Sequence, residues 1–206
     1  MSILVLVAIS GLIGVNLYGV TNDCDGSNLK GRDVNKFWRE GELILIFRHT
    51  ARCEEDAFSC PPGEDALTVE GVNQAQLVHM GLQHLGSGEI DSFHSPMIRT
   101  TMTAGIVLPE QSSPATWLVN ECKIGLFEKL RSHKRPGVNL VLFTHSSCLN
   151  SLKNKYQNPL LDFNAGDDKY FGVGVLFLPD DAANWDVSGC ILPAQWHEFE
   201  EKLNTT

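Results

Sequence analysis

The sequence predicts an α/β fold: a three-layer domain in which helices flank a mostly parallel central sheet, with an antiparallel hairpin at the sheet edge near the C-terminus. Residues 42–47 (ELILIF) and 139–143 (NLVLF) are short, almost uniformly apolar runs. Such runs are typical of strands buried on both faces of a parallel sheet. Helical patterns lie between them and a hairpin pattern follows, so the expected order is strand, three helices, strand, helix and two strands.

The first helix is expected to begin at Thr68, a good N-cap, and to extend to about Leu85 with apolar residues on one face. The second is expected to begin at Ser95-Pro96, because Ser caps well and Pro is favoured at the first helical position. Apolar residues at a spacing of four predict its buried side: Ile98, Met102 and Ile106. The remaining elements, in chain order, are a helix over residues 124–133, a short helix over 148–156, hairpin strands over 172–178 and 185–192, and a terminal helix over 194–204.

Composition limits both the organisation and the partners of the chain. Its 206 residues are 43% hydrophobic, which is enough for one domain with a buried core and too little for two large domains. With 16 Lys+Arg against 25 Asp+Glu, the formal net charge is −9. The chain lacks the basic surplus that provides most nucleic-acid affinity, so no nucleic-acid partner is expected.

The N-terminal residues 3–20 are apolar apart from Ser10 and Asn16. This pattern predicts a signal peptide or N-terminal membrane anchor over residues 1–22, followed by the domain proper over 23–206. A positively charged n-region and a clear A-x-A site are both missing, so cleavage is left open, and a buried first strand or helix is the alternative. Export predicts an extracytoplasmic location, periplasmic or secreted, with membrane contact only through this segment.

An even number of cysteines in an exported domain predicts disulfide bonds. Cys53 and Cys60 are the first candidate pair, because a short loop-like stretch separates them, and Cys122 with Cys148 is the second. Zinc binding is the alternative, but the sequence has no C-x-x-C pair. We therefore expect disulfides and no metal.

Both predicted parallel strands are followed by a histidine, His49 after the first and His145 after the second. Ligands bind at the carboxyl ends of strands in open α/β sheets, so the two imidazoles are expected at one site. Arg48, Arg52 and Arg99 add guanidinium groups, which bind phosphoryl oxygens through paired hydrogen bonds. A neutral imidazole can attack phosphorus while the arginines stabilise the transition state, so neither a cofactor nor a metal is required.

Four motifs in order carry a resemblance to a known family: LIFRHTARC (45–53), LTVEGVNQA (67–75), SPMIRTTMTA (95–104) and LFTHSSCL (142–149). Over about half of its length the chain resembles the histidine phosphatase, or phosphoglycerate mutase-like, superfamily. The resemblance implies a phosphoglycerate mutase-like fold. It also implies that His49 is the nucleophile that becomes phosphohistidine, that Arg48, Arg99 and His145 complete the phosphate pocket, and that Arg52 is a further pocket arginine.

The resemblance leaves the other roles less defined. Ser95 matches a helix cap, Ser146 or Ser147 is a candidate to offer a backbone N–H to phosphate, and the LTVEG motif is expected to be structural. The superfamily's general acid has no strong motif here. Glu121 is the first candidate, and its rivals are Glu54, Glu55 and Asp56.

Within the superfamily, the chain resembles the lipopolysaccharide core heptose(II)-phosphate phosphatases. The shared features are the R-H-x-x-R-C run (48–53), the nearby Cys60, a cysteine (Cys122) before the second strand, and T-H-x-x-C-L (144–149). The expected function is a metal-independent phosphomonoesterase acting on a small phosphorylated substrate, such as a phosphosugar of the cell envelope.

Three alternatives stay open at this stage. A non-catalytic module that binds phosphorylated ligands and a phosphomutase would both use the same residues. The third is a magnesium-dependent phosphatase of the haloacid dehalogenase type, suggested by residues 23–27 (DCDGS) with residues 166–168 as its later acidic motif. That mechanism needs its first Asp at the end of a buried strand, and only the targeting segment precedes it.

Overall fold

The computed structural model describes residues 24, 29, 32–53, 60, 65–156, 163, 168–179 and 185–196. Its strands are β1 (Ile44–Arg48), β2 (Ile90–His94), β3 (Ser112–Pro114), β4 (Asn139–Thr144), β5 (Gly174–Pro179) and β6 (Trp185–Ile191). Its α-helices are α1 (Val34–Arg39), α2 (Val69–His84), α3 (Ile98–Val107), α4 (Cys122–His133) and α5 (Ser146–Tyr156). Short 3-10 turns cover η2 (Thr116–Leu118), η4 (Asp168–Tyr170) and η5 (Pro193–Gln195).

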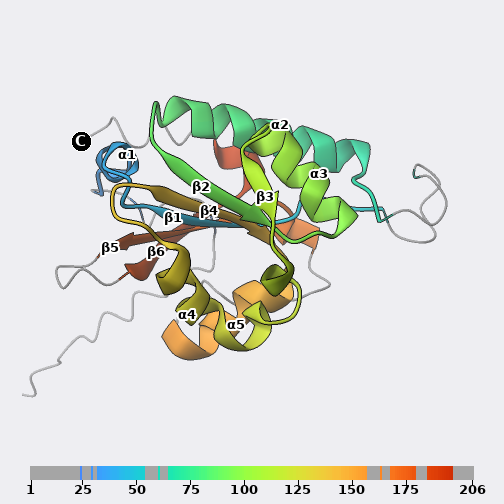
Figure 1. The fold of residues 1–206 in the computed structure, drawn as a ribbon. Coiled ribbons are helices and arrows are strands. Elements are labelled where there is room, and N and C mark those ends of the chain that lie inside the picture. The colour runs from blue at the N-terminus through green and yellow to red at the C-terminus, as the bar shows by residue number, and fades with distance from the viewer. Residues whose placement is uncertain are drawn as a thin grey trace, which may run out of the picture.

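The six strands form one sheet in the order β3-β2-β4-β1-β5-β6. Pairings β2 with β3, β2 with β4 and β1 with β4 are parallel, whereas β5 is antiparallel to both β1 and β6. Helices α1, α2 and α3 lie on one side of the sheet and α4 and α5 on the other (Figure 1). The predicted three-layer α/β fold with an antiparallel C-terminal hairpin is confirmed.

Successive residues of the central strands face opposite layers, because side chains along a strand alternate between the two faces of a sheet. On β1, Ile44 and Ile46 pack with α4 and α5, while Leu45 and Phe47 pack with α1, α2 and α3. Both faces are therefore covered, which explains why the run is apolar at every position. The second predicted strand, β4, is buried in the same way.

The prediction missed two strands of the sheet and one helix. Strand β2 reads IDSFH, a sequence without an apolar run, and β3 has only three residues. Helix α1 has six residues and was not expected. These elements are short or polar. Strands β2 and β3 are held by pairing within the sheet, and α1 is held by packing of Val34 and Trp38 in the core.

The predicted start and buried side of α3 are wrong. The backbone N–H of Ser95 donates to the Phe143 carbonyl at 3.0 Å, so Ser95 continues the sheet ladder and the helix begins three residues later. Ile98 is 51% exposed, and Met102 and Ile106 are half-buried. The buried residues are instead mostly small: Thr100, Thr103, Ala104 and Val107.

Three disulfides pair all six cysteines. The pairs Cys53–Cys60 and Cys122–Cys148 were predicted, and Cys24–Cys190 was not. Disulfides persist in oxidising compartments, so this set indicates a location outside the cytoplasm.

Within the described residues, no helix combines the length and apolarity needed to cross a bilayer. The targeting segment expected over residues 1–22 lies outside the described residues. The predicted terminal helix over 194–204 is described only as far as Trp196, and those residues belong mainly to the η5 turn.

Asn139 joins three segments at the amino ends of the strands. Its fully buried amide oxygen accepts from the N–H of Leu43 at 3.0 Å, and its nitrogen donates to the carbonyls of Trp38 and Glu89 at 2.8 and 3.2 Å. One side chain thus satisfies backbone groups that would otherwise be buried without partners.

We expect Asn139→Ala to lower the free energy of unfolding by about 2–4 kcal/mol, because it leaves buried polar groups unsatisfied. Denaturant unfolding followed by circular dichroism measures this loss. Asn73→Ala, at an exposed position of α2, is the matched control and should change stability by less than about 0.5 kcal/mol. Equal stability of the two variants would contradict the assigned role.

Candidate functional site

The parallel pairing of β1 with β4 brings the two predicted histidines together. Arg48 is in register with Thr144, so His49 and His145 follow at the same edge of the sheet. The His49 N–H donates to the Thr144 carbonyl at 3.0 Å, and the two imidazole centroids are 5.5 Å apart. The two histidines therefore lie together at the carboxyl ends of the strands, as expected.

The surroundings of His49 define its tautomer. The ring is 5% exposed, and its Nδ1 lies 2.9 Å from the carbonyl oxygen of Thr50. A carbonyl only accepts hydrogen bonds, so Nδ1 carries the proton and Nε2 keeps its lone pair. The imidazole is therefore held in the form that can act as a nucleophile through Nε2.

The loop after β1 keeps this arrangement in place. The peptide between Thr50 and Ala51 accepts from His49 through its carbonyl and donates through its N–H to Gln74 Oε1 on α2, at 2.9 Å. A Cβ on Gly71 would lie 2.0 Å from the Ala51 carbonyl oxygen, so only glycine lets α2 approach this closely. The LTVEG segment is thus structural, as expected, with Thr68 capping the helix through Gly71 N.

His145 has the opposite tautomer. Arg99 Nη2 lies 3.2 Å from His145 Nδ1, and a guanidinium can only donate, so Nδ1 is the acceptor. The proton is then on Nε2, which donates to Ser95 Oγ at 2.9 Å. The hydroxyl predicted to cap a helix instead fixes the orientation of the second imidazole.

The three predicted arginines are arranged around these rings. Arg99 lies in the first turn of α3 and forms an ion pair with Asp65, and Arg52 Nη1 lies 3.7 Å from the same carboxylate. The Arg48 guanidinium lies over the Phe171 ring, 4.2 Å from its centroid. We refer to Arg48, His49, Arg52, Arg99 and His145 together as the cationic site.

Sequence reasoning missed Asp65 and Phe171. Asp65 reaches the site because the segment after it forms an isolated antiparallel bridge between Arg52 and Leu67. Phe171 packs on His49 with centroids 5.5 Å apart, and Gly172 N–H donates to the His49 carbonyl at 3.1 Å. Both contacts join segments far apart in the chain, and no local pattern marks them.

Glu121, the predicted general acid, forms an ion pair with Lys129. The Glu121 side chain is 60% exposed, and its Oε2 lies 2.7 Å from Nζ of Lys129, on the helix α4 that begins after Glu121. Its rivals at positions 54–56 lie outside the described residues. Ser146 and Ser147 begin α5 directly after His145, where backbone N–H groups have no intrahelical acceptor.

Both imidazoles are neutral over most of the pH range. Burial lowers the pKa of His49 to about 3, and the nearby Arg99, His145 and Arg48 add to this effect. Burial also lowers the pKa of His145 to about 4, with contributions from Arg99, Lys123, Arg48 and Arg52. Removal from water disfavours the charged ring, and neighbouring cations disfavour it further.

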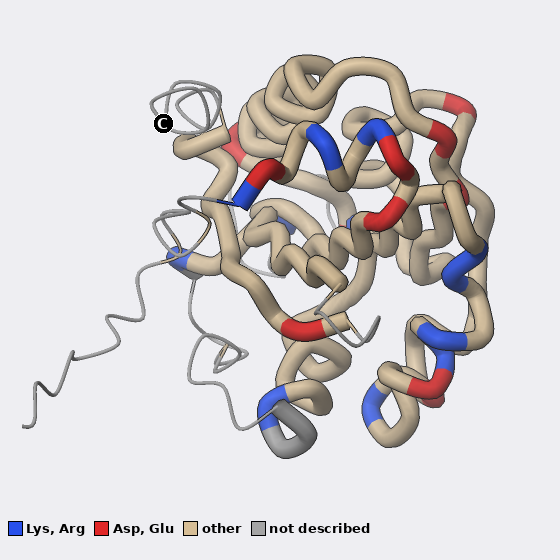
Figure 2. Tube along the Cα trace, turned by 90° about the vertical axis from the view of Figure 1, so that its left-hand side faces the viewer, with Lys and Arg blue, Asp and Glu red and all other residues tan. Residues whose placement is uncertain are grey.

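The arrangement suits an anion. In the described part of the chain, the Nε of Arg99 is buried without a hydrogen-bond partner, and such a donor matches a phosphoryl oxygen. Lys/Arg and Asp/Glu positions are interspersed along the described chain (Figure 2). Among described residues, no group of three or more His, Cys, Asp or Glu is placed to hold a metal ion.

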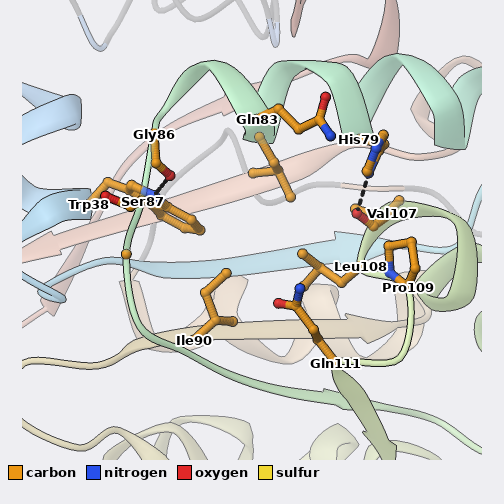
Figure 3. Close-up of a pocket in the computed structure, with 12 residues that line it drawn as sticks. Trp38, His79, Gln83, Gly86, Ser87, Ile90, Val107, Leu108, Pro109 and Gln111 are labelled. Carbon is orange, nitrogen blue, oxygen red and sulfur yellow. Dashed lines mark hydrogen bonds between the residues drawn. The ribbon is translucent and has the colours of Figure 1, made fainter.

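A separate cavity of about 300 Å³ lies near the amino end of β2, at the opposite end of that strand from the cationic site (Figure 3). Ile90, Leu82 and Val107 contribute apolar surface to it. The His79 ring and the Trp38 indole at its wall are hydrogen-bonded to the carbonyls of Val107 and Gly86. None of the predicted site residues lines this cavity.

Comparisons with known proteins find distant relatives and a shared fold. No protein-family model matches the chain. The lipopolysaccharide core heptose(II)-phosphate phosphatase of Escherichia coli O139:H28 (strain E24377A) is 22% identical over 158 residues, covering 74% of this chain and 77% of that protein. The protein of the same name from E. coli K12 is 21% identical over 152 residues, covering 71% and 74%.

Solved structures give the same fold. The protein histidine phosphatase SixA complexed with tungstate has a TM-score of 0.51 at 16% identity, covering 74% of this chain and 97% of that one. The phosphoglycerate mutase of Bacillus anthracis str. Sterne has a TM-score of 0.53 at 12% identity, covering 79% and 98%. The fold is therefore phosphoglycerate mutase-like.

The buried neutral state of His49 predicts a pH-dependent stability. Its pKa in the folded protein, about 3, is below the unfolded value of 6.5, so the unfolded chain binds the proton more readily. Stability is unaffected by this group above pH 6.5 and falls as the pH drops below it. From pH 7 to pH 5 the loss from His49 is about 2 kcal/mol.

Denaturant unfolding at pH 7, 6 and 5 measures this loss. We expect His49→Gln to remove about 2 kcal/mol of the wild-type decrease, while His84→Gln, at an exposed position of α2, should keep the wild-type decrease. Equal slopes for wild type and His49→Gln would show that the ring is not held neutral by burial.

Proposed function

Because the chain is a member of the histidine phosphatase, or phosphoglycerate mutase-like, superfamily, we propose that it is a metal-independent phosphomonoesterase that acts through a phosphohistidine intermediate on His49. One observation carries the proposal: Nδ1 of His49 is engaged by the Thr50 carbonyl, so Nε2 has a free lone pair beside the cationic groups. A buried neutral imidazole in that state needs no deprotonation before it attacks.

In the first step, Nε2 of His49 attacks phosphorus and the bond between phosphorus and the ester oxygen breaks. The bonding electron pair stays on the leaving oxygen, which takes a proton from the proposed general acid, Glu121, and departs as the alcohol. Arg48, Arg52 and Arg99 stabilise the negative charge on the phosphoryl oxygens. His145 holds Arg99 through the 3.2 Å contact and is itself oriented by Ser95.

In the second step, water attacks the phosphorus of phosphohistidine. The water gives a proton back to the proposed general acid, Glu121, the bond between nitrogen and phosphorus breaks, the electron pair returns to Nε2, and inorganic phosphate leaves. His49 is then ready for another cycle, with its Nδ1–H still donating to the Thr50 carbonyl. No metal takes part in either step.

We propose a phosphosugar of the cell envelope as the substrate, of the kind represented by a lipopolysaccharide core heptose phosphate. The support is the name of the curated relatives, which are heptose(II)-phosphate phosphatases at 21–22% identity. An extracytoplasmic location, consistent with three disulfides, would put the enzyme in the same compartment as such a substrate.

Trapping tests the mechanism. Brief exposure to a ³²P-labelled phosphomonoester should leave acid-labile, base-stable phosphate on wild type, and peptide mapping should place it on His49. His49→Ala should lose the label and at least about 1000-fold of turnover, because no other group can form the intermediate. EDTA should change neither result.

His79→Ala, outside the cationic site, is the matched control and should keep full labelling. Turnover that survives in His49→Ala, or that EDTA abolishes, would overturn the mechanism. Transfer of label to a second alcohol instead of water would indicate a phosphomutase. Tight binding of the phosphomonoester without turnover would indicate a non-catalytic module.

Glu121 is our proposed general acid, and a comparison of leaving groups tests it. An alkyl alcohol needs a proton to leave, whereas p-nitrophenolate does not, so Glu121→Gln should slow alkyl phosphate hydrolysis by about 100-fold and leave p-nitrophenyl phosphate hydrolysis unchanged. Lys129→Met removes the ion-pair partner of Glu121 and is the control. Equal effects of Glu121→Gln on both substrates would assign the proton to another group.

A further inference from the structure

Asp65 is a carboxylate placed among the guanidiniums that would bind the phosphoryl group. It forms an ion pair with Arg99 Nη1, and its other oxygen lies 3.7 Å from Arg52 Nη1. The Asp65 side chain is 28% exposed and that of Arg99 is 15% exposed, so water screens this interaction only partly. Neither the mechanism proposed above nor the motifs assign a role to this residue.

The backbone holds Asp65 at the site independently of its charge. The N–H of Cys53 donates to the Ala66 carbonyl at 2.8 Å, and the N–H of Thr68 donates to the Ala51 carbonyl at 3.1 Å. These bonds flank the antiparallel bridge between Arg52 and Leu67. A neutral side chain at position 65 would therefore keep its place beside Arg52.

Asp65 adds a negative charge to a site with three guanidiniums and two imidazoles that are neutral at pH 7. Lys123 adds a further positive charge, close enough to lower the pKa of His145. A phosphomonoester dianion carries two negative charges. When the phosphoryl group replaces the carboxylate on Arg99, Asp65 stays next to it as an anion, so a second anionic group of the substrate placed there is repelled.

We propose that Asp65 is a specificity-determining residue that admits phosphate esters of neutral polyols and rejects esters that carry a second anionic group close to the phosphate. A hydroxyl beside the ester can donate a hydrogen bond to Asp65, whereas a carboxylate or second phosphate in that position is repelled. This inference rests on the proposed function and refines it, because it names the residue that selects the substrate's alcohol.

Glycerol 3-phosphate and 3-phosphoglycerate form a matched pair, because they share the ester and its neighbouring hydroxyl and differ in a CH₂OH against a carboxylate. For wild type, we expect kcat/KM to favour glycerol 3-phosphate by at least about tenfold. Asp65→Asn should reduce the preference to less than about threefold, chiefly by improving the use of 3-phosphoglycerate. Raising the ionic strength should reduce the wild-type preference as well, because salt screens the repulsion.

Asp91→Asn is the control, because Asp91 also pairs with an arginine, Arg135, on an exposed surface away from the site. It should keep the wild-type preference. A preference that is absent in wild type, or unchanged in Asp65→Asn, would overturn the inference. A merely structural role for Asp65 would lower both kcat/KM values together and leave their ratio as it was.

Calorimetric binding of the same two compounds to His49→Asn and to His49→Asn/Asp65→Asn separates this inference from the proposed function. Weaker binding of 3-phosphoglycerate that depends on Asp65 supports the inference even if wild type hydrolyses neither compound, a result that would refute only the phosphatase proposal. Equal binding of both compounds to both variants would overturn the role of Asp65 even if the phosphatase proposal holds.

Discussion

The site depends on one interaction, the parallel pairing of β1 with β4. The register that places Arg48 beside Thr144 makes His49 and His145 the first residues beyond two adjacent strands. The hydrogen bond from the His49 N–H to the Thr144 carbonyl extends the ladder to the proposed nucleophile. The imidazole is thus attached to the most buried part of the fold, and rigid elements position functional groups more accurately than loops do.

Burial at this position determines the chemistry. Water is largely excluded from His49, so the ring remains neutral, and its environment decides which nitrogen carries the proton. His145 is held in the complementary tautomer by Arg99 and Ser95. The same strands that make the core apolar therefore hold one imidazole with its Nε2 lone pair unprotonated and a second imidazole in contact with Arg99.

The sequence was sufficient for the features that local patterns encode. Uniform apolar runs marked β1 and β4, and the histidine after each run marked the site. Strand β2 escaped prediction because its polar residues are buried only through pairing with β3 and β4. Ser95 is predicted as a helix cap, but its hydroxyl accepts a hydrogen bond from His145 Nε2. Asp65 lies beside the arginines because a β-bridge joins Arg52 to Leu67. These roles depend on non-local contacts, which a single sequence does not reveal.

Helix α2 contacts the loop after β1, and through this loop it affects His49, the proposed nucleophile. Gly71 leaves room for the Ala51 carbonyl. Gln74 accepts a hydrogen bond from the Ala51 N–H, and the carbonyl of the same peptide, that of Thr50, accepts one from His49 Nδ1. A side chain at position 71 would clash with the Ala51 carbonyl. Displacing Ala51 would in turn disturb the preceding peptide, whose carbonyl accepts from His49 Nδ1. The protonation state of the His49 ring is thus linked to the size of a residue on a neighbouring helix.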